Sequence, residues 1–232
     1  MRSKMKITLG VVVLVTIIGV FFPQLIHKDS PIASENINRA QEVFNNNGTS
    51  LEEPETVTEK TIIKGIILVN KTYGLPSNYN PGENPEAVEA LYKMTKAAQE
   101  EIGKTIQSVS GFRSYEYQKN LFNQYAQKDG VEKASTYSAR AGHSEHQTGL
   151  AFDIGGRNKE HWVKTSFERT EEGKWLKDNA HKYGFILRYP KGKTHITGYT
   201  YEPWHFRYVG VEHAEIIYKN DLTLEEYLLE GN

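Results

Sequence analysis

Two stretches of the sequence combine the side chains from which metal-dependent hydrolases are built. The stretch GHSEHQTGLAFDIGG (142–156) contains His146 and Asp153 among four glycines, and YEPWHFRYVG (201–210) contains His205. The chain has no cysteine, so histidine and carboxylate side chains would have to hold a metal. Two imidazoles and one carboxylate leave the fourth tetrahedral position open, as in catalytic zinc sites. Because such an ion polarises a carbonyl group and acidifies water, these residues predict metal-assisted hydrolysis.

The first imidazole of this set has two candidates, because His143 lies only three residues before His146. Gly149 stands between His146 and Asp153 and can bend the chain so that these two side chains approach each other. This spacing favours His146. Without a partner elsewhere in the chain, the whole stretch would be a glycine-rich turn whose polar side chains face water.

Alternating apolar and polar residues predict a strand in each stretch. Side chains of a strand point to opposite faces in turn, so Asp153 in 150–154 and His205 in 204–208 would face away from the core. The core faces would carry the apolar residues Leu150, Phe152, Ile154, Trp204, Phe206 and Tyr208. The two opposite faces could therefore share one cleft.

Glu202 lies three residues before His205 and directly before a proline. The proline keeps Glu202 extended and interrupts regular strand pairing, so this carboxylate can point into the cleft without being a ligand. There it could take a proton from water and deliver it to a leaving amine. Taken alone, a solvated carboxylate explains Glu202 equally well, but its place beside a predicted ligand favours a general base.

Together, the patterns S-x-H-x-x-G-x-A-x-D and E-P-W-H resemble those of VanY-type D-Ala-D-Ala carboxypeptidases and LdcB-like peptidases. These enzymes belong to a group of zinc peptidases that also includes lysostaphin-like enzymes and the hedgehog signalling domain. The resemblance covers about residues 59–220. It implies a Zn²⁺ ion on His146, Asp153 and His205, with Glu202 as general base and acid, and a small antiparallel sheet flanked by helices.

The stretch SGFRSYEYQ (110–118) extends the resemblance. In the family, the arginine at the position of Arg113 holds the free carboxylate of the substrate, and guanidinium groups bind carboxylates in a bidentate manner. The resemblance further implies that Gln118 and Ser144 contact the substrate. The alternative for Arg113 is a helix-entry arginine bonded to the backbone or to an acidic neighbour.

The leading functional hypothesis is therefore a D,D-carboxypeptidase, which removes the last D-alanine from a peptidoglycan stem peptide that ends in D-Ala-D-Ala. One alternative is an L,D-carboxypeptidase, which removes D-alanine from tetrapeptide stems. Another is a zinc-containing wall-binding module without catalysis. A net charge of −1 over 232 residues provides no basic surface of the kind that binds nucleic acid.

The N-terminus predicts a membrane partner. Residues 7–26 are uncharged and apolar and follow a basic start, MRSKMK, and such a run is long enough to span a bilayer with the rest of the chain outside. We expect residues 1–26 to form a single-pass anchor, with a cleaved signal and secretion as the alternative. The polar residues 27–58 would form a flexible linker to a catalytic domain at 59–232 outside the cell.

Periodicity, caps and turn residues predict the elements that must position these side chains. Helices are expected at 84–103, 114–130, 170–184, 211–220 and 223–231, and strands at 61–70, 104–112, 149–154, 185–190 and 204–209. The two kinds of element mix without regular alternation. This order predicts an α+β fold with a small, mostly antiparallel sheet flanked by helices.

Overall fold

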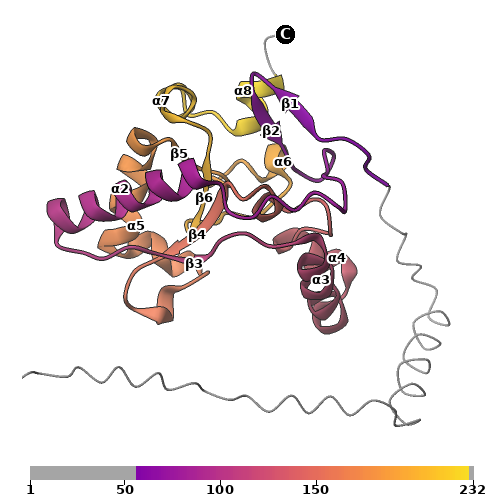
Figure 1. Ribbon diagram of the computed structural model, residues 1–232. Coiled ribbons are helices and arrows are strands. Elements are labelled where there is room, and N and C mark those ends of the chain that lie inside the picture. Colours follow the sequence, from indigo (N-terminus) through magenta and orange to yellow (C-terminus); the bar gives the residue numbers. More distant parts are fainter. Residues whose placement is uncertain (1–55, 230–232) are drawn as a thin grey trace, which may run out of the picture. The chain divides into compact units, whose positions relative to one another are not determined.

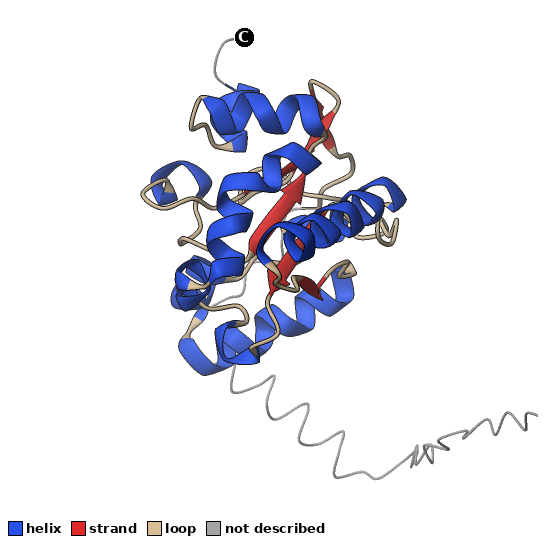
Figure 2. Cartoon of the chain, turned by 90° about the vertical axis from the view of Figure 1, so that its left-hand side faces the viewer, coloured by secondary structure: helices blue, strands red, loops and turns tan. Residues whose placement is uncertain are grey.

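The computed structural model describes residues 56–229, and its centre is a four-stranded antiparallel sheet (Figure 1). The spatial order of the strands is β3-β4-β6-β5. Their bounds are Gln107–Ser110 for β3, Ala151–Gly155 for β4, Phe185–Leu187 for β5 and His205–Tyr208 for β6. Helices surround these strands (Figure 2). The predicted α+β class and small antiparallel sheet are therefore confirmed.

The helices match the predicted segments in most places. They are α2 (Pro85–Ile102), α3 (Tyr115–Asp129), α4 (Val131–Tyr137), α5 (Glu171–Asn179), α6 (Thr194–Thr197), α7 (Val211–Lys219) and α8 (Leu224–Leu229). Four short 3₁₀ turns lie at Glu145–Thr148 (η1), Lys159–His161 (η2), Thr165–Arg169 (η3) and Ala180–Tyr183 (η4). The helix expected at 170–184 is thus α5 followed by η4, and both α4 and α6 lack a predicted counterpart.

The strand expected at 61–70 is in fact a hairpin of β1 (Thr61–Ile63) and β2 (Ile66–Leu68). Lys64 and Gly65 form its two-residue turn, and both have positive φ, 51° and 78°. Two central residues with positive φ are the requirement of the tight turn whose twist matches paired strands. The sequence pattern predicted one strand because most residues of 61–70 are β-branched or apolar, and Gly65 is the one residue inside that segment typical of a turn.

One face of the sheet packs on α2 and α5 and forms the main core. Phe152 and Ile154 of β4 and Phe206 of β6 are each about 1% exposed and contact apolar side chains of these helices, among them Met94 and Leu176. They are three of the six strand residues predicted to face the core, and the other three, Leu150, Trp204 and Tyr208, are partly buried against the same cluster. A second cluster joins β2, β5, α7 and α8, and a third joins α3 to α4.

The opposite face of the sheet presents a row of polar residues across three strands. Ser110 on β3 pairs with Asp153 on β4, and Asp153 pairs with His205 on β6. Directly paired residues point to the same face of a sheet. The register therefore places the predicted carboxylate and imidazole side by side.

No helix within residues 56–229 has the length and hydropathy needed to cross a bilayer. The predicted anchor at 1–26 and nearly all of the predicted linker at 27–58 lie outside the described residues. Both therefore stay predictions.

Candidate active site

His146 reaches the polar face of the sheet from η1, the 3₁₀ turn just before β4. Gly149 ends this turn with φ 71°, and its amide donates to the carbonyl oxygen of His146 at 3.2 Å. A Cβ atom at Gly149 would collide with the backbone oxygen of Gly82. Only glycine fits this left-handed position beside another backbone, so the bend predicted between His146 and Asp153 has a steric reason.

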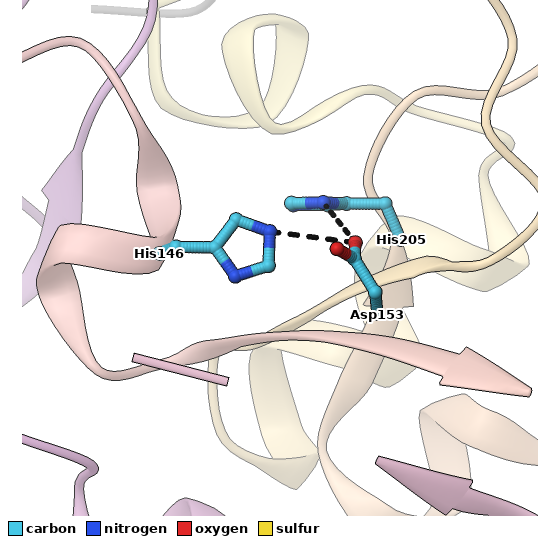
Figure 3. Close-up of side chains that lie close together, drawn as sticks. All are labelled: His146, Asp153 and His205. Atoms are coloured by element: carbon cyan, nitrogen blue, oxygen red, sulfur yellow. Dashed lines mark hydrogen bonds and ion pairs between the residues drawn. The ribbon is translucent and has the colours of Figure 1, made fainter. Parts of the chain in front are cut away.

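The side chains of His146, Asp153 and His205 converge at one point (Figure 3). Nε2 of His146 lies 3.3 Å from Oδ1 of Asp153, and Nδ1 of His205 lies 3.2 Å from the same oxygen. The three side chains are buried, with residue exposures of 2%, 6% and 4%. Within residues 56–229, they form a group whose candidate ligand atoms all lie within 4.8 Å of one another.

His143, the alternative imidazole, lies elsewhere. Its Nδ1 is 2.8 Å from the carbonyl oxygen of Asn70, and it does not belong to the convergent group. The structure thus brings His146, and not His143, to Asp153 and His205.

Hydrogen bonds leave one nitrogen of His146 free to accept an ion. Its Nδ1 is 2.7 Å from the carbonyl oxygen of Gly111, and because a carbonyl only accepts, Nδ1 carries the proton. Nε2 is then a lone-pair donor, and it is buried without a hydrogen-bond partner in the described part of the chain. An orphaned, buried lone pair of this kind is satisfied by a metal ion.

The electrostatics of the site favour a positive charge beside Asp153. Burial alone would lower the pKa of His205, but hydrogen bonds to Asp153 and Glu145 outweigh it and raise this pKa to about 9. Burial lowers the pKa of His146 to about 4, and the nearby Arg113 adds to the effect. The imidazole of His146 therefore stays neutral. The imidazole of His205 is positively charged, and a bound cation could take the place of this charge beside Asp153.

Glu202 lies beside this group, just before β6. Its Oε2 is 3.8 Å from Nδ1 of His205, and its backbone amide donates to the carbonyl oxygen of Tyr189 at 3.1 Å. Burial is the largest influence on the carboxyl group and raises its pKa to about 7. A carboxyl group with a pKa near neutrality can both take and give a proton.

Arg113 enters the site from the loop before α3. Its Nη1 donates to Oε1 of Gln118 at 3.1 Å, and its Nη2 is 3.9 Å from Oδ2 of Asp153. Its Nε is buried and has no hydrogen-bond partner among residues 56–229. Arg113 therefore retains donors for a further anionic group.

Gln118 is committed to protein contacts. Its amide nitrogen donates to the carbonyl oxygen of Ala139 at 2.6 Å and to Oγ of Ser138 at 3.4 Å. Its oxygen accepts from Arg113, so Gln118 orients the arginine. The predicted substrate contact of Gln118 stays a prediction.

All of the residues predicted for the site border one cavity of about 520 Å³. Its wall includes Arg113, Gln118, Ser144, His146, Asp153, Glu202 and His205, together with tyrosines from α3, α4 and the loops before β6. A cavity of this size holds a small peptide end. Three candidate ligands, a free carboxylate and a guanidinium thus face the same space.

Comparison with known families matches residues 81–211 to the VanY model, described as D-alanyl-D-alanine carboxypeptidase. This chain belongs to the VanY family. YodJ of Bacillus subtilis (strain 168), a protein named as a putative carboxypeptidase, is 44% identical to this VanY-family chain over 197 residues. The alignment covers 77% of the chain and 69% of YodJ.

Two solved structures extend the comparison. The LdcB LD-carboxypeptidase, whose structure is described as revealing the basis of peptidoglycan recognition, is 43% identical with a TM-score of 0.66. The match covers 73% of this chain and 92% of LdcB. A mutant of the vancomycin resistance D,D-pentapeptidase VanY from a VanB-type cassette, in complex with Zn(II), is 35% identical with a TM-score of 0.61. That match covers 70% of this chain and 97% of the other.

The donor set of this VanY-family protein fits a divalent metal. Two imidazole nitrogens and one carboxylate oxygen make a three-ligand set of the kind found in catalytic zinc sites. The orphaned Nε2 of His146 and the raised pKa of His205 both indicate a place for positive charge.

Sequence reasoning missed three charged residues behind the ligands. Glu145, Arg188 and Arg207 are 1%, 0% and 0% exposed, and Nε2 of His205 lies 3.4 Å from Oε2 of Glu145. A signal for the two arginines was present, since Arg188 and Arg207 stand in the predicted strands 185–190 and 204–209 among mostly apolar residues. A charge in a buried strand requires a buried partner.

Proposed function

We propose that this protein is a zinc-dependent carboxypeptidase that releases the C-terminal D-alanine of peptidoglycan stem peptides. The observation that supports this proposal best is the convergence of His146, Asp153 and His205 beside the unliganded carboxylate of Glu202. A structural metal site would have no need of the open cavity or of the extra carboxylate. Membership of the VanY family supports the substrate class.

His146, Asp153 and His205 would hold the zinc through Nε2, a carboxylate oxygen and Nδ1. The bound zinc supplies a Lewis acid for the scissile carbonyl group and lowers the pKa of a water molecule. Arg113 binds the terminal carboxylate of the peptide, which selects a free chain end and sets the position of the last peptide bond.

Glu202 transfers the proton. Hydrolysis breaks the C–N bond and adds a hydroxyl group from water to the carbonyl carbon. Glu202 takes the proton that this water loses and donates it to the amine of the departing D-alanine. The buried position of Glu202, 8% exposed, keeps bulk water away from this transfer.

Two cuts use this chemistry, and the sequence patterns do not distinguish the D,D cut of the leading hypothesis from the L,D cut. The family model is described by the D,D activity, whereas identity to the two solved structures favours the L,D cut. Identity to the LdcB LD-carboxypeptidase is 43%, compared with 35% to the VanY D,D-pentapeptidase. We therefore propose the tetrapeptide stem as the preferred substrate, with the pentapeptide stem as the alternative. A single-pass anchor at residues 1–26 would place the domain outside the membrane, next to this substrate.

The test is to incubate the purified protein and zinc with stem peptides that end in D-Ala-D-Ala or in a single D-Ala, and to weigh the products. Loss of one alanine from the tetrapeptide alone supports the L,D cut, and a pentapeptide that stops at the tetrapeptide indicates the D,D cut. A peptide with an amidated C-terminus is the control, because it offers Arg113 no carboxylate. Bound zinc without any hydrolysis would instead indicate a wall-binding module and refute the proposed activity.

A further inference from the structure

Glu145 is a buried carboxylate that the proposed reaction does not use. It lies in η1 next to His146, on the cavity wall, and it is 1% exposed. A carboxylate this deeply buried is costly unless charged donors compensate it. The partners of Glu145 therefore indicate its role.

Two arginines and one histidine surround this carboxylate. Oε1 of Glu145 accepts from Nε of Arg188 and from Nη1 of Arg207, each at 2.8 Å. Oε2 faces Nε2 of His205 at 3.4 Å. One oxygen is thus held by the protein frame, and the other faces a proposed zinc ligand.

The two arginines are themselves fixed from outside the site. Arg188 donates through Nη1 and Nη2 to the carboxylate of Glu225 on α8, at 2.8 and 2.6 Å. Nδ2 of Asn70 donates to the same carboxylate at 3.1 Å, and Nη2 of Arg207 donates to the carbonyl oxygen of Ile67 at 2.7 Å. Two acidic and two basic side chains therefore form a neutral buried network between the metal site, the β1–β2 hairpin and α8.

We propose that Glu145 is a positioning residue that holds His205 with its Nε2–H directed at Oε2 and its Nδ1 lone pair directed at the metal. Each ring nitrogen of a ligating histidine has a separate task, and the partner of the distal nitrogen sets tautomer and ring orientation. Removing such a partner typically costs about 10- to 100-fold in metal affinity. Because its Oε1 is bonded to both arginines, Glu145 cannot swing away from His205.

This inference rests on the proposed metal site, but not on the proposed cleavage. Glu145 and Glu225 form a matched pair for the test, since both bind Arg188 and only Glu145 faces His205. If Glu145 merely stabilises the fold, both Glu→Gln variants should behave alike. If Glu145 positions His205, only Glu145→Gln should weaken zinc binding.

The experiment measures the zinc dissociation constant of the full chain by competition with a chelator, together with the urea midpoint of the metal-free protein. We expect Glu145→Gln to bind zinc about 10- to 100-fold more weakly than the wild type. Glu225→Gln should lower the urea midpoint but leave the zinc affinity at the wild-type value. The visible spectrum of the Co²⁺-substituted protein, which reports ligand geometry, should change in Glu145→Gln only.

Wild-type zinc affinity in Glu145→Gln, or an equal loss of affinity in Glu225→Gln, would overturn the inference. Should Glu145→Gln fail to fold, Glu145→Asp provides the second test. It keeps the charge but shortens the reach to His205, and wild-type zinc affinity in that variant would also count against positioning. A wild-type protein that binds zinc but cleaves no peptide refutes the proposed function and leaves this inference standing.

Discussion

Replacing Glu202 by glutamine should separate proton transfer from the rest of the site. The substitution keeps the volume and removes the acid–base group, whose contribution is about 10²- to 10⁴-fold in kcat. This loss corresponds to about 2.7–5.4 kcal/mol of transition-state stabilisation. We expect the upper half of this range, because the other carboxylates of the cavity wall are engaged: Asp153 contacts both histidines, and Glu145 is held by two arginines.

The fold should tolerate this change. Glu202 is buried and forms no ion pair with an arginine or lysine within residues 56–229, so a neutral amide relieves the cost of burying a charge. The assay is kcat on the tetrapeptide stem, with zinc content and the urea midpoint measured on the same sample. Glu116→Gln, at an exposed position in the first turn of α3, is the control for the chemical change.

Two results would refute this reasoning. Full turnover in Glu202→Gln would show that another group moves the proton. Loss of zinc together with activity would show that Glu202 acts by retaining the metal.

Four further outcomes are expected. Arg113→Lys should lower kcat/KM for free-acid peptides about 10- to 100-fold, because a charge-assisted bond contributes about 1.5–3 kcal/mol; steady-state kinetics measures this. A chelator should abolish turnover, and zinc at about 100 times its Kd should raise the unfolding free energy by about 2.7 kcal/mol, read from urea titrations. Thr223→Ala should lower the unfolding free energy by about 1 kcal/mol in the same titrations, since Thr223 and Glu226 form a reciprocal cap. Val163→Gly should raise the urea midpoint, because Val163 has φ 51°, a strained position for a β-branched residue.

Sequence patterns sufficed to predict the helices and strands whose ends are set by capping residues and by alternating apolar and polar residues. Asn84 accepts from the amides of Glu86 and Ala87, and Gly103 closes the same helix in a left-handed conformation with φ 67°. Both caps act within one turn, so the sequence alone could place α2. The alternation in β4 and β6 also sufficed to assign Asp153 and His205 to the face away from Phe152 and Phe206.

The features that sequence reasoning missed depend on contacts between distant segments. Glu145 looks like a surface residue of a polar turn, and only the folded chain brings Arg188 and Arg207 to it. The separate helix α4 escaped notice because Gly130, expected to end a helix, in fact divides α3 from α4. Residue types and spacing suggested the chemistry and placed Arg188 and Arg207 in predicted strands, but they did not identify the buried carboxylate that both arginines bind.

Because the polar residues of the site are paired across β3, β4 and β6, the site is sensitive to a change of chain length inside these strands. It is less sensitive to a change of length in the loops between them. Deleting Ala151 or Phe152 would shift β4 by one residue, turn Asp153 toward the apolar core and end ion binding. The connection from β4 to α5 anchors Phe167 in the main core, but its exposed Val163 borders the cavity, and surface loop length added at Val163 costs little free energy. An insertion at that exposed position would therefore alter the cavity wall while leaving the strand register that aligns Asp153 with His205 unchanged.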